Sequence, residues 1–317
     1  MEFKPYIESD YGELAAKVNL LPDFFTGFQP ERREEIVAEE AKFYHSITEP
    51  YSVDDRLEKF YVSFPSYDGV EIKMKVYMPK NLSSPAAAWV FTHGGGWMTC
   101  SVETHDYVPS YVAAKAGVVC FNIEYRLAPE HKFPVGLEDS YAAIKFIIEN
   151  AERFKVDTAR ISVGGDSSGG NFAAALALMA RDRGEFKLDK QVLVYPATDL
   201  TGSVRKKSAE VYAPVGGGDN DAPAVSFSDI WCSSADEVKS PYVSMLLADN
   251  LSDLPDALFI QAECDSLCDD GLMYAQRLHD AGVKVQCEIY KGMPHAFILR
   301  TYEETFAALD RIVAFLK

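Results

Sequence analysis

Apolar residues along this chain gather in short runs that alternate with segments of helical spacing. Runs rich in β-branched and aromatic residues between turn-forming residues predict strands. Such runs lie at residues 59–64, 70–78, 87–92, 118–125, 160–163, 191–195, 257–262 and 283–290. Helical spacing is found at residues 107–116, 137–150, 172–180, 271–279 and 303–315. The alternation predicts an α/β fold in which one mostly parallel eight-stranded sheet carries helices on both faces.

Two segments interrupt this alternation. Helical patterns at residues 11–21 and 31–47 precede the first strand, and residues 201–239 separate the sixth strand from the seventh. Open α/β sheets bind their ligands at the carboxyl ends of the strands. We therefore expect a single domain over residues 1–317, in which residues 1–50 and 201–239 pack together as a small helical cap over that edge.

Composition and charge narrow the class of protein. The chain has 317 residues, of which 48% are hydrophobic and 25% charged, as in ordinary soluble proteins, and this length allows one large α/β domain or two small ones. Its formal net charge of −17 argues against nucleic acids and anionic membrane surfaces as partners. No apolar run approaches the roughly 20 residues that span a membrane.

The cysteines and the N-terminus bear on the compartment. The first residues lack the basic start and apolar core of a signal peptide, and the six cysteines are dispersed, which favours free thiols in a reducing cytoplasm. Cys264 and Cys268 lack the second pair that a zinc site would need. We expect a cytoplasmic protein without metal, cofactor or membrane partner, and the sequence leaves a homodimer open.

The pattern Gly165-Asp166-Ser167-Ser168-Gly169 lies where the strand at 160–163 meets the alanine-rich helix. In a nucleophile elbow, G-x-S-x-G forms a sharp strand-to-helix turn that exposes a strained serine. The glycines are needed because strand and helix approach too closely for a Cβ, and the helix directs its free N–H groups at a developing oxyanion. This context favours an elbow over an ordinary glycine-rich turn, and Ser167 is the predicted nucleophile.

A second glycine cluster, His93-Gly94-Gly95-Gly96-Trp97, directly follows the strand at 87–92. Three glycines let successive N–H groups face one point and let a substrate come close. Such donors stabilise a tetrahedral oxyanion by about 3–4 kcal/mol each in a measured case. The triplet at residues 216–218 is interpreted instead as a loop of the cap.

Six segments in order make the chain resemble the hormone-sensitive-lipase-like branch of the α/β-hydrolases, the bacterial family IV esterases. They lie at residues 93–97, 125–131, 165–171, 240–241, 265–269 and 293–297. The resemblance covers roughly residues 55–317 and implies an α/β-hydrolase fold and carboxylesterase activity. Ser168 stands where the family usually has alanine, and Ser266 where it often has proline. Because Ser168 retains its backbone N–H, the oxyanion hole should survive.

The general base follows from the order of residues in this fold, which is serine, acid, histidine. A serine hydroxyl is a poor nucleophile until an imidazole takes its proton, so the base must lie after Ser167. His279 falls late in a predicted helix, where a surface histidine is ordinary. His295 lies in a loop after the last strand, between Gly292 and Pro294 on one side and the closing helix on the other. His295 is the predicted base.

The acid should follow the seventh strand. Asp265 comes just after that strand, whereas Asp269 and Asp270 open the next helix, where the helix dipole accounts for acidic residues. We therefore predict Asp265 as the acid and expect Asp269 to cap the helix and hold the loop near His295.

The predicted reaction is attack of Ser167 on an ester carbonyl, with His295 as base and Asp265 as its orienter, followed by hydrolysis of the acyl-enzyme. The predicted oxyanion donors are the backbone N–H groups of Gly95, Gly96 and Ser168. Because His295 must be neutral to accept the proton, activity should fall below roughly pH 6–6.5.

Other residues of these motifs have supporting roles in this interpretation. We expect Asp166 to hydrogen-bond within the oxyanion loop and His93 to brace that loop. Tyr125, Arg126 and Glu130 are expected to form a buried polar cluster beneath it.

Aromatic residues are the candidates for substrate binding, and they are Trp97, Tyr195, Tyr212, Phe227 and Trp231. Residues of the cap could equally form only its core. The short insertion and the lack of an interfacial amphipathic segment favour short-chain esters, as small-molecule substrates, over emulsified lipid. Deacetylation of a sugar or small metabolite fits equally well. A non-catalytic ligand-binding member of the fold is the remaining alternative, against which the intact His295 argues.

Overall fold

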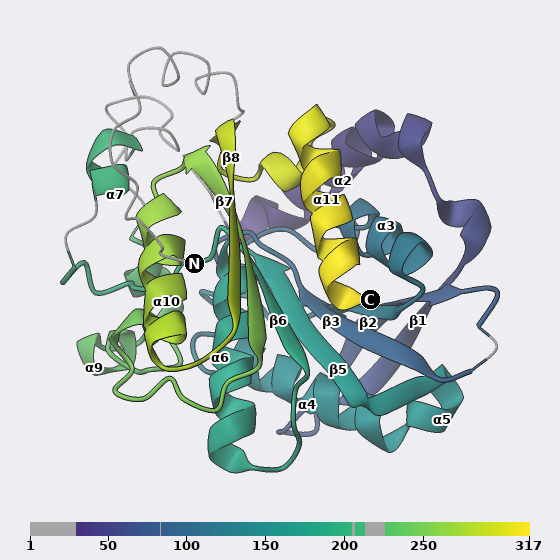
Figure 1. Cartoon of the computed structure of the whole chain (residues 1–317), viewed down its shortest axis with the longest axis horizontal. Helices are drawn as coiled ribbons and strands as arrows, with labels where there is room; N and C mark the ends of the chain where they lie inside the picture. Colours follow the sequence, from purple (N-terminus) through teal and green to yellow (C-terminus); the bar gives the residue numbers. More distant parts are fainter. Residues whose placement is uncertain (1–29, 83, 205–206, 213–225) are drawn as a thin grey trace.

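The computed structural model describes residues 30–82, 84–204, 207–212 and 226–317 (Figure 1). The predicted helix at residues 11–21 and the glycine triplet at residues 216–218 lie outside the described residues. Within the described ranges, no helix is both long and apolar enough to cross a membrane.

One eight-stranded sheet forms the centre of the molecule, in the order β1-β2-β4-β3-β5-β6-β7-β8. The strands are β1 (Leu57–Pro65), β2 (Glu71–Pro79), β3 (Ala86–Thr92), β4 (Val119–Glu124), β5 (Val156–Asp166), β6 (Lys190–Val194), β7 (Asp256–Cys264) and β8 (Val285–Pro294). β2 runs antiparallel to both of its neighbours, and all strands from β4 across to β8 are parallel. The predicted eight-stranded, mostly parallel sheet is confirmed.

Helices cover both faces of the sheet (Figure 1). They are α2 (Arg33–Thr48), α3 (Tyr107–Ala116), α4 (Val135–Glu149), α5 (Ala151–Phe154), α6 (Ser168–Arg183), α7 (Lys207–Tyr212), α8 (Phe227–Trp231), α9 (Ala235–Val238), α10 (Cys268–Asp280) and α11 (Glu303–Leu316). Short 3₁₀ turns lie at Pro30–Arg32, Glu49–Tyr51, Asp54–Arg56, Met245–Leu247 and Phe297–Leu299.

The core consists of two layers, one on each face of the sheet. Residues of α4, α6 and α10 belong to one buried cluster, and residues of α3 and α11 belong to the other, together with Tyr44 of α2. β3 contributes to both layers because alternate side chains point to opposite faces: Ala88 and Val90 enter the first cluster, and Trp89 and Phe91 the second. A strand buried on both faces reads as a continuous apolar run, which is the pattern of residues 86–92.

β5 is longer than its apolar run predicted, because it continues through Gly164 and Gly165 to Asp166. Glycine is unfavourable in strands, so the sequence pattern ends at Val163. The structure requires glycine at 164, where a Cβ would lie 2.3 Å from Nε1 of Trp89. Strand pairing with β3 and β6 holds these glycines extended, and β5 therefore runs directly into the turn at Ser167.

Both interrupting segments reach the loop that follows β3. Arg33, at the start of α2, donates from Nε to the carbonyl of Met98 at 2.8 Å. Trp231, at the end of α8, stacks on Trp97 with ring centroids 4.3 Å apart. The loop after β3 is thus contacted from two parts of the chain that are far apart in sequence.

Candidate active site

Ser167 occupies the sharp turn between β5 and α6. Its backbone has φ 55° and ψ −120°, a strained conformation for an L-residue. The turn is held because Ser167 N–H donates to Val194 O at 2.9 Å and Asn171 N–H donates to Ser167 O at 3.0 Å. A Cβ on Gly169 would lie 2.0 Å from Thr92 O, which is why no other residue fits there. The strain is therefore imposed by the packing of α6 against β3 and β5.

Three side chains from three separate loops meet at this turn. His295 Nε2 lies 2.9 Å from Ser167 Oγ, and His295 Nδ1 lies 2.6 Å from Asp265 Oδ2. Asp265 follows β7 and is buried, and its Oδ1 accepts the N–H of Leu267 at 2.8 Å. The geometry provides a nucleophile, a base within hydrogen-bonding reach and a carboxylate that orients the base.

The environment of His295 favours its charged form. Burial alone would lower the pKa of His295, but the adjacent Asp265 carboxylate, with a smaller contribution from Asp166, raises it above its ordinary value. The ring of Tyr195 packs against the imidazole with centroids 4.8 Å apart. His279, the other histidine after Ser167, lies in the last turn of α10.

The glycine loop after β3 is fixed from within. Gly94 N–H donates to Asp166 Oδ1 at 2.9 Å, so the prediction that Asp166 hydrogen-bonds within this loop is confirmed. Gly95 has φ +117° and accepts from the N–H groups of Met98 and Thr99 at 3.1 and 3.0 Å. A Cβ on Gly95 would lie 2.2 Å from Thr99 O. The backbone N–H of Gly94 therefore already has an acceptor in the carboxylate of Asp166.

Ser168 is the first residue of α6. Its N–H belongs to the first turn, where backbone donors have no acceptor within the helix. Its side chain is buried, facing away from solvent. What Ser168 can offer a ligand at the turn is therefore its backbone N–H.

Asp166 also has partners that the sequence did not indicate. His105 Nε2 lies 3.2 Å from Asp166 Oδ1, and Tyr195 OH donates to Oδ2 at 3.5 Å. Burial works to raise the pKa of Asp166, but His105 and the Gly94 N–H together hold it below its ordinary value. A buried anion therefore lies beside the glycine loop. No local pattern marks His105, because its partner is distant in the sequence.

His93 braces the glycine loop, as expected. Its Nδ1 lies 2.7 Å from Gly94 O, and its ring stacks on Tyr125 with centroids 4.4 Å apart. Tyr125 OH donates to His93 O at 2.7 Å. Burial, with His105 nearby, lowers the pKa of His93 to about 3, so the imidazole is neutral near pH 7.

The expected buried cluster of Tyr125, Arg126 and Glu130 is only partly present. The side chain of Arg126 donates two hydrogen bonds to the buried Asp139, from Nε at 2.9 Å and from Nη2 at 2.7 Å. Glu130 does not join them: its side chain is 44% exposed and pairs with Arg33. The prediction was wrong for Glu130 because α2, which supplies its partner, lies far away in the sequence.

The expected role of Asp269 was also wrong. Its Oδ2 accepts the N–H of Ser208 at 2.8 Å, so it joins α10 to α7 rather than to the loop of His295. That loop is held by Glu263, whose Oε2 accepts the N–H of Gly292 at 2.7 Å. An acidic residue at a helix start suggests a cap, but the pattern does not reveal which segment folds over it.

The five aromatic candidates occupy three places. Trp97, Phe227 and Trp231 form one cluster, in which the indoles stack in parallel and the phenyl ring meets Trp97 edge-on at 6.2 Å. Tyr195 is buried against His295, and Tyr212 is buried at the end of α7. The indole stack lies directly beside the glycine loop, since Trp97 is the residue after Gly96.

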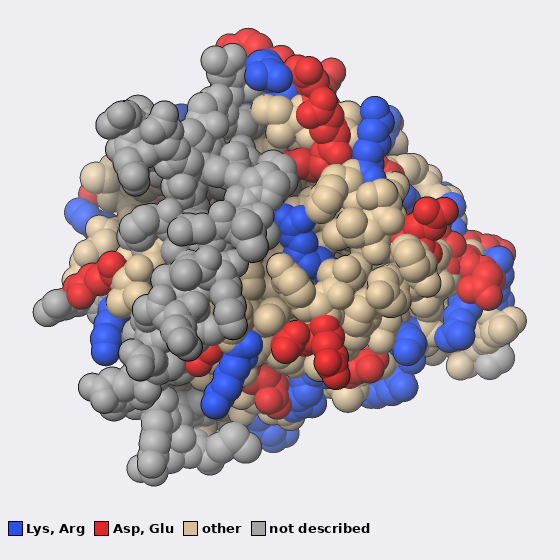
Figure 2. All heavy atoms as spheres, turned by 90° about the horizontal axis from the view of Figure 1, so that it is seen from above, with Lys and Arg blue, Asp and Glu red and all other residues tan. Residues whose placement is uncertain are grey.

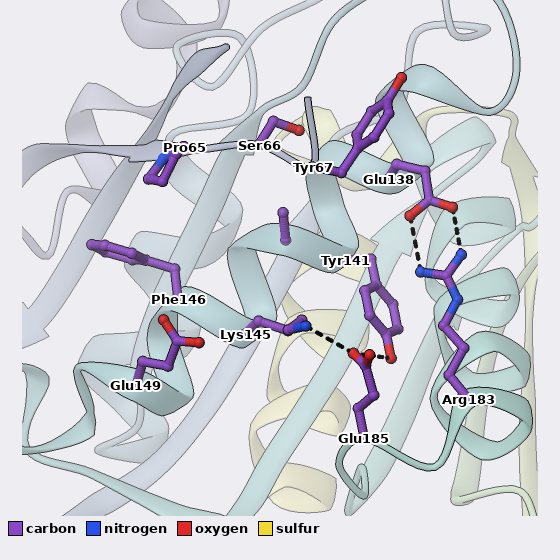
Figure 3. Close-up of a pocket in the computed structure, with 11 residues that line it drawn as sticks. Pro65, Ser66, Tyr67, Glu138, Tyr141, Lys145, Phe146, Glu149, Arg183 and Glu185 are labelled. Carbon is purple, nitrogen blue, oxygen red and sulfur yellow. Dashed lines mark hydrogen bonds and ion pairs between the residues drawn. The ribbon is translucent and has the colours of Figure 1, made fainter. Parts of the chain in front are cut away.

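The other surfaces of the described residues show fewer features of a binding site. Acidic and basic side chains are interspersed on the face in Figure 2. A separate pocket of about 270 Å³ lies near the far end of α6, roughly 23 Å along that helix from the turn (Figure 3). Its two cations are paired, Arg183 with Glu138 and Lys145 with Glu185. Among the described residues, no group of three or more His, Cys, Asp or Glu could hold a metal ion.

Comparisons with known proteins agree with this geometry. A family model described as the alpha/beta hydrolase fold matches residues 89–299. The carboxylesterase NlhH of Mycobacterium tuberculosis is 36% identical over 233 residues, 73% of each protein. An ethyl acetate hydrolase of Pseudomonas putida is 34% identical over 242 residues, 75% of this chain and 74% of that protein. The solved structure of a hyperthermophilic esterase from the archaeon Pyrobaculum calidifontis matches 96% of each chain, with a TM-score of 0.85 and 36% identity.

Proposed function

Because the chain belongs to the hormone-sensitive-lipase-like carboxylesterases of the alpha/beta hydrolase fold, which cleave esters as serine hydrolases, we propose that Ser167, His295 and Asp265 perform this reaction. The observation that carries the proposal is the pair of contacts at His295, 2.9 Å to Ser167 Oγ and 2.6 Å to Asp265 Oδ2. This arrangement moves a proton from serine to imidazole while the carboxylate stabilises the imidazolium that forms.

The reaction proceeds in two stages. Ser167 Oγ attacks the ester carbonyl as its proton passes to His295 Nε2, and the tetrahedral intermediate collapses when His295 protonates the leaving alcohol. Water then attacks the acyl-enzyme with His295 again as base, which releases the acid and restores Ser167. The oxyanion of each tetrahedral intermediate accepts hydrogen bonds from the backbone N–H groups of Gly95, Gly96 and Ser168.

Short-chain acyl groups are the substrates this site fits best. The indoles of Trp97 and Trp231 are buried and stack beside the glycine loop, and we propose that this stack limits the length of the acyl chain. We assign Trp97, Phe227 and Trp231 to the wall of the substrate pocket, with Tyr195 beneath His295 and Tyr212 in the cap. The relative from Pseudomonas putida that is named for ethyl acetate is consistent with this choice.

A series of p-nitrophenyl esters from acetate to decanoate tests both the reaction and the acyl preference. We expect kcat/KM to be highest for acetate or butyrate and to fall steadily toward decanoate. Ser167→Ala should lower turnover to near the uncatalysed rate for every ester. Wild-type turnover in Ser167→Ala would overturn the proposed nucleophile, and a maximum at decanoate would overturn the acyl preference.

The same proposal extends to organisation and location. We propose that the described parts of the two interrupting segments, residues 30–50, 201–204, 207–212 and 226–239, belong to a cap on a single domain, and the contacts of Arg33 and Trp231 with the loop after β3 support this; the remaining residues of the expected cap lie outside the described ranges. A cytoplasmic location is supported by the six free cysteines.

A homodimer would pair an edge strand of the sheet, β1 or β8, with a second copy, because such strands carry unpaired backbone groups. Light scattering on the purified protein separates monomer from dimer.

A further inference from the structure

β7 and β8 change register just before they deliver the proposed acid and base. Ala262 pairs with Tyr290, but Cys264 pairs with Pro294, so two steps along β7 correspond to four along β8. β8 therefore carries a bulge of extra residues between Tyr290 and Pro294. Such bulges redirect a strand and re-aim the side chains that follow.

This bulge sets the register that places the proposed acid opposite the proposed base. At the register of the Ala262–Tyr290 pair, Asp265 would lie opposite Met293. Beyond the Cys264–Pro294 pair, the next residues on the two chains are Asp265 and His295. The bulge thus advances β8 until the imidazole stands beside its carboxylate, at 2.6 Å.

A bulge also releases a backbone donor from strand pairing, and buried donors need a partner. Gly292 lies inside the bulge with φ +71°, a conformation that glycine adopts readily. Its N–H is taken by Oε2 of Glu263 at 2.7 Å. Glu263 lies on β7 between the two pairs that differ in register, and its side chain is only 4% exposed.

We propose that Glu263 is a positioning residue of the esterase site, whose carboxylate holds the bulge of β8 in the shape that places His295 opposite Asp265. This inference rests on the proposed function of His295 and Asp265. Glu263 itself contacts neither the serine nor the imidazole in any hydrogen bond that the described residues show. It acts through Gly292 and through Met293 and Pro294, the two residues that join Gly292 to His295 along the chain.

The test is Glu263→Ala, which removes the acceptor, compared with Glu263→Gln, which retains an oxygen of similar reach. For p-nitrophenyl acetate we expect Glu263→Ala to lower kcat about 10- to 100-fold, because a displacement near 1 Å in a catalytic group costs this much. KM should change little, since substrate contacts are elsewhere. Glu263→Gln should remain within about tenfold of wild type.

The pH profile separates positioning from general loss of structure. In Glu263→Ala, His295 loses contact with Asp265, so the acid limb of kcat/KM should move to lower pH. The matched control is Glu124→Ala, which removes a carboxylate that likewise accepts a backbone N–H, that of Val102 at 3.2 Å, at the end of β4. We expect its acid limb to coincide with that of wild type. Should Glu263→Ala not fold, the same measurements are made on Glu263→Asp, whose side chain is shorter by one methylene and withdraws the carboxylate from Gly292.

The kinetic outcomes distinguish a failure of the Glu263 inference from a failure of the proposed function. An acid limb that does not move in Glu263→Ala overturns the inference, as does an equal loss of kcat in Glu263→Gln and Glu263→Ala. Ser167→Ala is measured alongside to test the proposed function. Wild-type turnover in Ser167→Ala overturns that function and this inference with it. An inactive Ser167→Ala beside a Glu263→Ala enzyme with wild-type kcat overturns this inference alone.

Discussion

The carboxylate of Asp265 beside His295 fixes the sign of the pH dependence. Asp265 at 2.6 Å outweighs burial and raises the pKa of the imidazole, with Asp166 adding to the effect. The base works only when neutral, so activity is lost as the pH falls through that raised pKa. The sequence alone predicts a fall below roughly pH 6–6.5, whereas the structure moves the acid limb of kcat/KM above about pH 6.5.

Asp265→Asn tests the pH dependence at the residue that raises the pKa of His295. The amide keeps the shape of the side chain but removes its charge, so the pKa of His295 should drop and the acid limb should move to lower pH. We expect kcat to fall by about 10⁴-fold, as it does when the orienting carboxylate of a serine protease becomes an amide. Rate profiles between pH 5 and 9 measure both effects. A limb that stays in place would mean that Asp265 does not set the pKa of the base.

Ser167 and Ser168 are neighbours with different expected contributions. Ser168 offers its backbone N–H at the start of α6, and alanine has the same N–H. Ser168→Ala should therefore retain kcat/KM within about threefold of wild type and lose no more than about 1 kcal/mol of stability. Steady-state kinetics and urea unfolding on the same preparation measure both quantities. A loss approaching that of Ser167→Ala would assign a catalytic role to the Ser168 hydroxyl.

Helix α6 is constrained at its two ends in different ways, although glycine occupies both. At the N-terminal end, a Cβ on Gly169 would lie 2.0 Å from Thr92 O and 2.6 Å from His93 O. At the C-terminal end, Gly184 has φ +66° with open space around it. Lack of space for a Cβ excludes other residues at Gly169, whereas the positive φ disfavours them at Gly184.

Alanine at each of these glycines makes a matched pair of variants. Gly169→Ala should destabilise the fold by about 1–3 kcal/mol and abolish activity, because α6 must move away from β3 and displace Ser167. Gly184→Ala should cost about 1 kcal/mol and leave kcat unchanged. Urea unfolding and p-nitrophenyl acetate turnover report the two effects. Full activity in a folded Gly169→Ala would contradict the close approach that defines the elbow.

Local patterns predict elements and motifs well, and long-range partners poorly. The strands, the longer helices beyond residue 30 and the turn at Ser167 follow from apolar spacing and from glycine positions, whereas the short helices α5, α7, α8 and α9 do not. Glu263, His105 and Arg33 gave no signal, because each acts on a backbone or side chain brought close only by the folded sheet. The error at Asp269 has the same origin, since its partner Ser208 lies 61 residues away.

At the scale of the whole molecule, α2 contacts the loop after β3 through a buried acid. Glu40 of α2 accepts from Cys100 Sγ at 3.8 Å, and burial raises its pKa to about 7. The folded protein therefore binds this proton more tightly than the unfolded chain, whose glutamates titrate near 4.5. The stability that the proton provides is present at low pH and is lost as the pH rises from about 4.5 through 7.

Glu40→Gln removes this dependence by keeping a neutral side chain at all pH values. We expect it to be more stable than wild type at pH 8, by up to about 3 kcal/mol, and to differ little at pH 5. Thermal or urea unfolding at the two pH values gives the comparison. Equal differences at pH 5 and pH 8 would show that Glu40 does not carry a proton in the folded protein near neutrality.

The central claim is that Ser167 forms the covalent bond to the acyl group, and covalent labelling tests it most directly. A fluorophosphonate reacts with an activated serine, and peptide mass mapping locates the modified residue. We expect one label per chain, on Ser167, with loss of activity in proportion to labelling and no label in Ser167→Ala. Label on any other residue, or full activity in a chain whose Ser167 is completely labelled, would contradict it.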